Sequence, residues 1–238
     1  MIFVRQLRLD HRDDTHRYPF TLPAVRHLLQ HPLDLTRPVT FLTGDNGAGK
    51  STLIEAIAVA AGFNAEGGTQ SFHFATKATE SSLGDYLTLS WGTKKPRTGF
   101  FLRAESFYNV ITEIDRIGAG IHASYGGKSL HERSHGESFI DLMTHRFGGR
   151  GLYVLDEPEA ALSVKGCLTV LRRMHELVQE GSQFIIATHS PILLAAPDAT
   201  ILEITDTIDE VSYDTAEPVA LTRNFLGGPD RFLRHLLD

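Results

Sequence analysis

The chain has 238 residues, of which 42% are hydrophobic, and a formal net charge of −6. This length is enough for one domain of ordinary size with a substantial core. No apolar run approaches the roughly 20 residues that span a bilayer, and the N-terminus lacks the layout of a signal peptide, so no integral membrane segment is expected. The single cysteine, Cys167, excludes an intrachain disulfide, and these features together indicate a cytoplasmic protein.

The acidic balance argues against a surface that binds nucleic acid through its phosphates alone, but it leaves room for a local basic patch. Three clusters are candidates, although each is more often a solvated face or turn: Arg5 with Arg8, residues 94–97, and Arg172 with Arg173. DNA or an effector protein therefore remains open as a partner.

The first part of the chain predicts strands and helices around a glycine-rich loop. Alternating apolar and basic residues at 2–9 indicate an edge strand, and residues 24–29 a short helix. Residues 38–43 are an apolar run typical of a buried strand. Residues 51–61, rich in Leu, Ile and Ala, predict a helix that ends at Gly62.

The loop between this strand and this helix reads Gly44-Asp45-Asn46-Gly47-Ala48-Gly49-Lys50-Ser51, which is the phosphate-binding pattern G-x-x-x-x-G-K-[ST]. Its glycines let several backbone N–H groups point inward at an anion, and the following helix adds its positive dipole end. Lys50 is expected on the outer phosphates, and the hydroxyl of Ser51 on magnesium. The strand before and the helix after the loop make an accidental match to the pattern a poor explanation.

The middle of the chain is rich in glycine, serine and threonine. Residues 63–82 predict a loop excursion, and residues 118–127 a second glycine-rich loop. Two short strands at 86–91 and 99–103 are separated by a basic turn, which predicts a hairpin. Helices are expected at residues 106–117 and 137–147.

The last part of the chain alternates strands with helices. Residues 151–155 and 183–188 are continuous apolar runs, as in strands buried on both faces. The remaining expected elements are a helix at 163–180, a hairpin of strands at 199–204 and 210–213, and a closing helix at 229–237. This order favours an α/β fold with a mostly parallel sheet.

Two carboxylates, Asp156 and Glu157, follow the apolar strand at 151–155. Ligands of open α/β sheets bind at the carboxyl ends of the strands, where the phosphate-binding loop also begins. Asp156 is therefore placed to hold magnesium, and Glu157 to act as general base toward an attacking water. His189 follows the next buried strand and is a candidate contact to the γ-phosphate, although a lone histidine after a strand is more often structural.

Three segments in this order resemble the ATP-binding cassette (ABC) ATPase superfamily. They are Gly44 to Ser51 (Walker A), Leu155-Asp156-Glu157-Pro158-Glu159-Ala160-Ala161-Leu162-Ser163 (Walker B with D-loop) and Thr188-His189-Ser190-Pro191 (H-loop). The residues of the last two segments are most similar to those of the soluble branch, which includes SMC-like, RecF-like and OLD-like ATPases. The resemblance implies ATP and Mg²⁺ as cofactors and a P-loop NTPase fold: a mostly parallel sheet flanked by helices, an antiparallel β subdomain and a small helical lobe.

The resemblance also implies one ABC-type domain over residues 1–238. Its expected parts are antiparallel β regions at about 1–43 and 84–104, a helical lobe with the signature segment at about 105–148, and a Walker B to H-loop core at 150–205. The implied nucleotide-binding residues of the loop and helix are Gly44, Asp45, Asn46, Gly47, Ala48, Gly49, Lys50, Ser51 and Thr52. Lys50, Glu157 and His189 are the implied catalytic residues.

The family carries a signature segment, usually Leu-Ser-Gly-Gly-Gln, before Walker B. The best match is Arg133-Ser134-His135-Gly136-Glu137, in which Ser134 and Gly136 agree with the family pattern. A serine hydroxyl at a helix N-terminus is suited to a γ-phosphate. In this family the signature serine acts on the nucleotide of a second subunit, so the resemblance implies a homodimer that closes on ATP.

Two further family positions have several candidates in this sequence. Tyr18 or Phe20 could stack on adenine, although an aromatic beside a proline is as often core packing. The Q-loop residue that meets magnesium could be Gln70 or Glu105, and Glu105 is better placed because it follows the strand at 99–103.

The sequence thus favours a soluble ABC-type ATPase, which hydrolyses ATP to ADP and phosphate and works as a conformational switch, in DNA maintenance or phage defence. The nucleotide-binding subunit of a membrane transporter is the alternative. A small-molecule P-loop kinase fits less well, because a kinase needs an arginine-bearing lid and an acceptor pocket.

Overall fold

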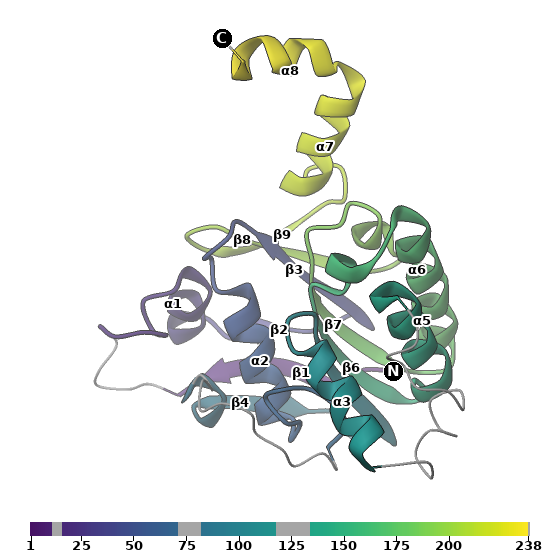
Figure 1. The fold of residues 1–238 in the computed structure, drawn as a ribbon. Coiled ribbons are helices and arrows are strands. Elements are labelled where there is room, and N and C mark those ends of the chain that lie inside the picture. The colour runs from purple at the N-terminus through teal and green to yellow at the C-terminus, as the bar shows by residue number, and fades with distance from the viewer. Residues whose placement is uncertain (11–15, 71–81, 118–133, 238) are drawn as a thin grey trace.

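The computed structural model describes residues 1–10, 16–70, 82–117 and 134–237, and over these ranges it forms two sheets (Figure 1). The larger sheet has six strands in the order β5-β6-β7-β3-β8-β9, and β9 is its antiparallel edge. The smaller sheet is antiparallel, with the order β2-β1-β4. The strands are β1 (Val4–Leu9), β2 (Leu33–Asp34), β3 (Val39–Gly44), β4 (Leu87–Trp91), β5 (Thr98–Arg103), β6 (Gly151–Asp156), β7 (Gln183–Ala187), β8 (Thr200–Ile204) and β9 (Ile208–Val211).

Helices cover both faces of the larger sheet. Helix α2 lies between the two sheets, while α5 and α6 cover the opposite face (Figure 1). The helices are α1 (Pro23–Gln30), α2 (Lys50–Ala60), α3 (Phe107–Ile117), α5 (His135–Arg146), α6 (Val164–Gln179), α7 (Glu217–Gly227) and α8 (Pro229–Leu236). Short 3-10 turns occur at Ser82–Asp85, Pro158–Ala161 and Leu193–Ala195. The mostly parallel sheet flanked by helices, with an antiparallel sheet beside it, confirms the predicted fold class.

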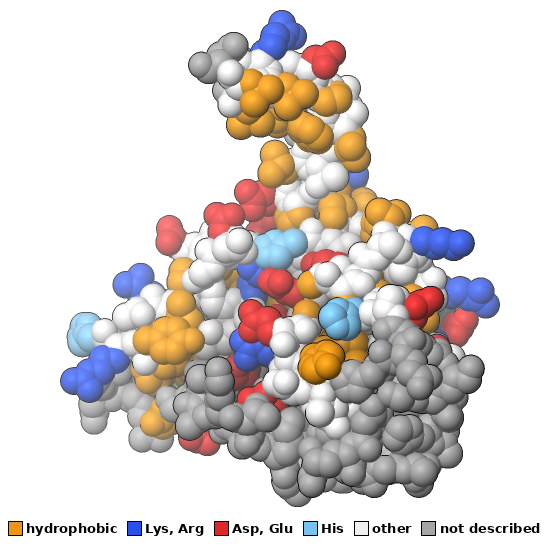
Figure 2. All heavy atoms as spheres, in the orientation of Figure 1, with side chains coloured by type: hydrophobic (Ala, Val, Ile, Leu, Met, Phe, Trp, Pro, Cys, Tyr) orange, Lys and Arg blue, Asp and Glu red, His pale blue; other side chains and the backbone are white. Residues whose placement is uncertain are grey.

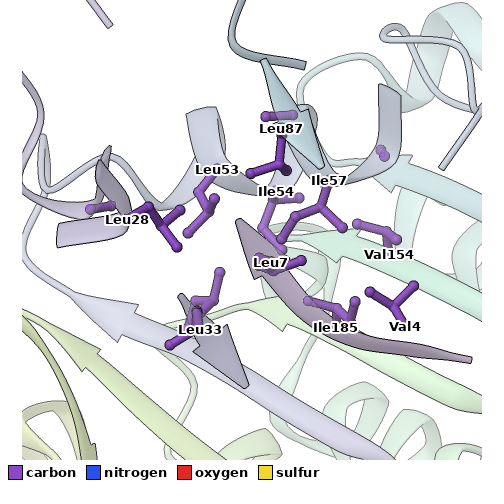
Figure 3. Close-up of a cluster of buried hydrophobic side chains, with 14 of the residues drawn as sticks. Val4, Leu7, Leu28, Leu33, Leu53, Ile54, Ile57, Leu87, Val154 and Ile185 are labelled. Atoms are coloured by element: carbon purple, nitrogen blue, oxygen red, sulfur yellow. The ribbon is translucent and has the colours of Figure 1, made fainter. Parts of the chain in front are cut away.

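The strands of the larger sheet send alternate side chains into two separate cores, as the two-residue period of a strand requires. Val154 and Ile185 pack on α2 and the small sheet, together with Leu7 of β1 (Figure 3). Their neighbours Tyr153 and Phe184 pack on the other face, among the side chains of α5 and α6. The continuous apolar runs of β6 and β7 therefore reflect burial on both faces.

The predicted hairpin of residues 86–91 and 99–103 is wrong, because the two strands lie in different sheets. Strand β4 pairs antiparallel with β1, whereas β5 pairs parallel with β6 from Thr98 to Arg103. The physical reason is burial: Phe100, Phe101 and Leu102 are all buried, which needs a core on each face of β5. Strand β4 instead alternates buried and less buried residues, as a strand with one covered face does.

Two related expectations also change. Strand β1 is the middle strand of the small sheet, so the prediction of an edge strand at residues 2–9 is wrong. Strands β3 and β5, which fall within the expected antiparallel regions 1–43 and 84–104, belong to the mostly parallel sheet. Helix α7 was not predicted from the sequence, whereas the hairpin of β8 and β9 is confirmed. Residues 71–81 of the expected excursion, the glycine-rich 118–127 and Arg133 lie outside the described residues.

The parallel register brings the ends of four strands into one row. Arg103 of β5 is paired with Asp156 of β6, Asp156 with Ala187 of β7, and Ala187 with Leu42 of β3. The chain leaves each of these strands within a few residues of that row. Segments that are far apart in sequence are therefore gathered at one edge of the sheet.

Gly44 ends β3 at a position that no side chain fits. Its φ is +133°, and a β-carbon there would lie 2.2 Å from the carbonyl oxygen of Ile204 on β8. We expect Gly44→Ala to lower the free energy of unfolding by at least ~2 kcal/mol, because backbone strain and a steric clash add. Denaturant unfolding of the nucleotide-free protein measures this.

Gly47→Ala is the matched control for this substitution. Gly47 also has a positive φ, +84°, but a β-carbon there would meet no atom within 4 Å. Its expected cost is only the conformational strain, about 1 kcal/mol. Equal losses for the two variants would contradict the assignment of Gly44 to close packing against β8.

Candidate active site

The loop between β3 and α2 is wound around the amine of Lys50. Gly44, Gly47 and Gly49 all have positive φ values, which lets the loop turn back on itself. The Nζ of Lys50 donates hydrogen bonds of 2.8 Å to the carbonyl oxygens of Gly44 and Asp45, and Lys50 is only 4% exposed. Burial lowers the pKa of Lys50, and the charge of Glu157 is the largest opposing influence. A cation is thus held at the centre of a cradle of backbone groups.

Ser51 and Asp156 meet across 105 positions of sequence. The Oγ of Ser51, in the first turn of α2, donates a hydrogen bond of 3.0 Å to Oδ1 of Asp156 at the end of β6. Asp156 is 4% exposed, and burial raises its pKa to about 6, against the lowering effects of the Ser51 hydrogen bond and the Arg103 charge. A hydroxyl and a carboxylate at hydrogen-bond distance are the hard oxygen donors that Mg²⁺ takes from proteins, with water and phosphate oxygens as its other ligands.

Among the described residues, no group of three or more His, Cys, Asp or Glu side chains could hold a metal ion. In nucleotide sites Mg²⁺ is held by one or two protein carboxylates, together with water and phosphate oxygens. Ser51 and Asp156 are the residues that fit it.

Glu157 and His189 stand together beside the loop. Glu157 adopts a left-handed backbone conformation with φ +48°, and its N–H donates to the carbonyl oxygen of Ala187, at 2.9 Å. The Nε2 of His189 lies 3.9 Å from Oε1 of Glu157. That nitrogen is shielded from solvent and has no hydrogen-bond partner among the described residues. An unsatisfied imidazole nitrogen beside a carboxylate fits a site that a polar ligand completes.

These residues line an open hollow. Its walls are Asp45 and Asn46 of the loop, Glu157, His189, and three residues of α7, namely Glu217, Pro218 and Leu221. Figure 2 shows acidic and histidine side chains grouped at the foot of α7. Helix α7, which the sequence did not predict, is therefore part of the rim of the site.

Ser134 caps α5 rather than contributing to this hollow. Its N–H and its hydroxyl donate to Oε2 of Glu137, at 3.0 and 2.7 Å, and the N–H of Glu137 points back at its Oγ at 3.4 Å. This reciprocal arrangement is a capping box. Ser134 is exposed, and Gly136 is packed so closely that a β-carbon there would lie 2.7 Å from the carbonyl oxygen of Ala161. The signature segment and the D-loop thus form one surface of the chain.

The adenine candidates separate clearly. Phe20 is buried, with its ring 5.7 Å from that of Tyr86, so it is a core residue. Tyr18 is exposed, and its hydroxyl lies 3.3 Å from Oγ1 of Thr52 in the first turn of α2. Tyr18 is therefore next to the phosphate-binding loop with its ring accessible, and stacking on adenine stays a prediction for it.

The Q-loop candidates also differ in position. The amide of Gln70 donates to the carbonyl oxygen of Ala61 behind the end of α2, which places it away from Ser51. Glu105 is near Asp156, since its charge contributes to raising the pKa of Asp156. However, the side chain of Glu105 is 83% exposed and lies 3.5 Å from the guanidinium of Arg103. Its role as a magnesium ligand remains a prediction.

Arg103 was not predicted as a site residue, yet it lies at the centre of an ion-pair network. Its guanidinium is 2.7 Å from Glu55 of α2, 3.5 Å from Glu105 and 3.6 Å from Asp156. The parallel pairing of β5 with β6 puts Arg103 beside Asp156. The prediction of a hairpin for residues 99–103 excluded this pairing, and therefore Arg103 was not expected at the site.

Glu159 was missed as well. Its Oε1 accepts a hydrogen bond of 2.6 Å from the backbone N–H of His189, so it ties the segment after Walker B to the H-loop. The run Asp156-Glu157-Pro158-Glu159 contained the residue, but nothing in its spacing showed which segment it would contact.

Comparison with known proteins agrees with this geometry. A family model described as "AAA domain" matches residues 24–118, which include the phosphate-binding loop and Arg103. The ribose import ATP-binding protein RbsA of Shigella dysenteriae is 26% identical over 210 residues, which cover 79% of this chain and 42% of that protein. The chain is thus similar to members of the ABC-type ATPase superfamily. ATP binding and, in general, ATP hydrolysis are properties of that superfamily.

A less similar relative also matches most of this chain. The macrolide export ATP-binding/permease protein MacB of Hahella chejuensis is 23% identical over 205 residues, or 75% of this chain and 29% of that protein. The chain thus spans less than half of the length of these curated relatives. None of the described helices has the length and apolar character that a bilayer span requires.

One solved structure shows the same fold. The cbiO1 protein of Clostridium perfringens, described as part of the ABC transporter complex cbiONQ, superimposes with a TM-score of 0.52 at 15% identity, covering 100% of this chain and 99% of that one. The SMC head domain of Thermotoga maritima has a TM-score of 0.48 at 18% identity, covering 89% and 100% of the two chains.

The assignment of Lys50 to the phosphates leads to a direct binding experiment. We expect Lys50→Ala to weaken binding of Mg-ATP roughly 100-fold, because a charge-assisted contact to phosphate is lost. Titration with a fluorescent ATP analogue measures this. Lys94→Ala, in the exposed turn between β4 and β5, is the control and should bind normally. Unchanged affinity in the Lys50 variant, with normal thermal unfolding, would refute the phosphate assignment.

The raised pKa of Asp156 predicts that the free energy of unfolding of the nucleotide-free protein depends on pH. Because the folded-state pKa of about 6 is above the ordinary value of 3.8, the native state binds the proton more tightly than the unfolded state. Stability therefore falls as pH rises between these two values, and the ionised carboxylate destabilises the fold above pH 6. We expect Asp156→Asn to raise the free energy of unfolding at pH 8 by up to about 3 kcal/mol.

The gain from Asp156→Asn should shrink to roughly half at pH 5 and nearly vanish below about pH 3, where both states of the wild type are protonated. Unfolding by urea at pH 8, 6 and 5, with Asp45→Asn at the exposed loop position as control, measures it. A variant less stable than the wild type at pH 8 would show that the Ser51 and Arg103 contacts outweigh the cost of burial.

Proposed function

We propose that the chain is an ATP-hydrolysing switch of the soluble branch of the superfamily, similar to SMC-, RecF- and OLD-like ATPases, and that it works as a homodimer closed around ATP. One observation carries the proposal. Lys50, Ser51, Asp156, Glu157 and His189 converge at one sheet edge, while Ser134 lies on a separate, exposed surface beside the D-loop.

The proposed chemistry is attack of water on the γ-phosphate. The loop N–H groups and Lys50 bind the phosphates, and Ser51 with Asp156 would hold a magnesium ion, which would neutralise phosphate charge when bound. Glu157 accepts the proton of the attacking water as general base. The unsatisfied Nε2 of His189 contacts the γ-phosphate, and the hydrogen bond from its backbone to Glu159 keeps the ring in place. Positioning and charge stabilisation supply most of the acceleration.

A second copy completes the proposed site. The hydroxyl of Ser134 is exposed at a helix N-terminus, where the backbone N–H groups of α5 and the helix dipole favour an anion. In the chain itself this hydroxyl contacts Glu137. In the dimer this hydroxyl would donate a hydrogen bond to the γ-phosphate that the partner binds. A single copy is therefore expected to be a poor ATPase. Opening of the dimer after hydrolysis is the proposed mechanical output.

The task served by this switch is proposed as DNA maintenance or phage defence. The basic clusters give this only limited support. Arg172 and Arg173 both pair with Glu176, and Nζ of Lys95 lies 3.5 Å above the ring of Trp91. A DNA partner would therefore contact a surface already engaged within the chain, and an effector protein remains the other option.

A transporter subunit is the second candidate, because the curated relatives named above include an import and an export protein. A chain of that kind would fractionate with membranes through a permease, which cell fractionation detects. The third reading, a small-molecule kinase, needs an acceptor. Release of phosphate from ATP without any added acceptor separates ATPase from kinase.

Glu157→Gln tests the switch directly. The amide keeps the shape of the site but cannot accept a proton, so the variant should bind Mg-ATP and accumulate as a dimer. Light scattering on a sizing column, with ATP and with ADP, measures the species present. Glu210→Gln, on the exposed edge strand β9, is the control and should not accumulate as a dimer.

A Glu157→Gln variant that binds ATP and stays monomeric at every concentration would contradict the sandwich model. The wild-type rate gives a second readout. ATP turnover per chain should rise with protein concentration, because two chains build each site. A further rise on adding DNA would favour the DNA-linked task over the transporter reading.

A further inference from the structure

The C-terminal helices α7 and α8, residues 216–237, form an arm that stands away from the body of the molecule (Figure 1). Its large apolar side chains face solvent, and Figure 2 shows them as a continuous apolar surface on the arm. Half of the twelve exposed large hydrophobic residues among the described residues lie here: Leu221, Phe225, Leu226, Leu233, Leu236 and Leu237. Such a concentration on one element marks an interaction surface.

The foot of the arm is fixed to the body. Ala216 and Val219 are buried in the core on the α5 and α6 face of the sheet. The N–H of Glu217 donates to a carboxylate oxygen of Glu203 on β8, at 2.7 Å. Further along, Phe225 of α7 and Phe232 of α8 make an edge-to-face ring contact at 5.8 Å. These contacts hold the apolar surface in a defined place instead of leaving it on a loose tail.

The arm rises from the rim of the ATP site. Pro218 and Leu221 line the same hollow as Asn46, Glu157 and His189. Under the proposed function, on which this inference rests, a second copy must cover that hollow. The arm therefore begins where the partner is expected to arrive and extends outward from there.

A second exposed apolar surface lies at the start of α6. Val164 and Leu168 are 68% and 54% exposed, and Leu171 continues them at helical spacing along a groove whose other apolar walls are Ala195 and Pro197. Helix α6 begins directly after the D-loop, which packs on the signature segment. This groove is thus beside the surface that enters the partner's ATP site.

We propose that the arm of one copy packs its apolar surface into the α6 groove of the second copy when the dimer closes, and that the second arm does the same in return. The occupant is a second copy because both surfaces flank the same proposed interface. An anionic membrane is a poorer partner for the arm: Arg231 and Arg234 share α8 with Asp230, and the whole chain carries a net charge of −6.

The test uses chains of residues 1–238 with Glu157→Gln, which are expected to form the ATP dimer. Leu226→Glu alters the arm, and Leu168→Glu alters the groove. Both side chains are exposed, so folding should be unaffected. The controls add the same charge on the same helices: Asn224→Glu on α7, about 160° around the helix from Leu226, and Thr169→Glu on α6. Sedimentation in Mg-ATP gives the dimer dissociation constant, and thermal unfolding checks the fold.

Each of the two leucine variants should weaken the dimer at least about tenfold, and each control should change it less than twofold. The combination Leu226→Lys with Leu168→Glu should recover most of the loss, because the two new charges would then attract across the interface. Such rescue requires that the two side chains meet.

Other outcomes would overturn the inference in distinguishable ways. Full dimerisation of all four variants would leave the proposed function standing and remove the arm from the interface. Weakening by Leu226→Glu alone, without rescue, would show that the arm docks elsewhere. Loss of binding to phosphatidylglycerol vesicles, with the dimer intact, would assign the arm to a membrane. Failure of the parent Glu157→Gln chain, whose arm is unaltered, to dimerise in Mg-ATP would contradict the proposed function itself.

Discussion

The parallel register of the larger sheet is the constraint on which the site depends. Hydrogen bonding between β5, β6, β7 and β3 fixes where each strand ends, so Arg103 and Asp156 must lie side by side and the loop of Lys50 must begin next to them. No local interaction within the loop could achieve this, because Ser51 and Asp156 are far apart in sequence. A slip of one residue in any of these strands would also turn its core residues to the wrong face.

The same edge carries features that lower stability. Glu157 has a left-handed backbone conformation, Asp156 is buried with a raised pKa, and burial lowers the pKa of Lys50. Strain and desolvated charges of this kind cluster at functional sites. The two apolar cores on either side of the sheet offset these costs, because every residue of β3, β6 and β7 is buried. Because the interior is stable, the edge of the sheet can hold the strained and charged groups that chemistry requires.

Much of the fold and of the candidate site could be predicted from the sequence, because the signals for them are local. The loop pattern, the apolar runs of β6 and β7 and the polar residues after them are local signals, and parallel strands align their ends without further information. The fold class followed from the alternation of strands and helices. The signature segment was found only as the third member of an ordered set, since a serine before His135 has no meaning alone.

The predictions that failed concern which helices and strands pack against one another. Strands β4 and β5 are adjacent in the chain and separated by a basic turn, as in a hairpin, yet the burial of Phe100, Phe101 and Leu102 places β5 between two cores. Three apolar residues in a row were the available clue. Arg103 and Glu159 were missed for the same reason, since their partners come from elements far away in sequence. Helix α7 has little contact with the core beyond its foot, and so it left no strong apolar period to detect.

Symmetry decides how the separate surfaces of this chain can be used. The proposed ATP site with the arm at its rim forms one surface, and the signature segment with the α6 groove forms another. A head-to-tail contact between these two surfaces would leave one of each open and would continue into a filament, unless the rotation closes it. A two-fold dimer uses all four surfaces at once. In that arrangement ATP between Lys50 and the partner's signature segment would share its interface with the apolar contact of the arms. Occupancy of the site would then govern the burial of the arm, which gives the closed state a driving force beyond the nucleotide contacts alone.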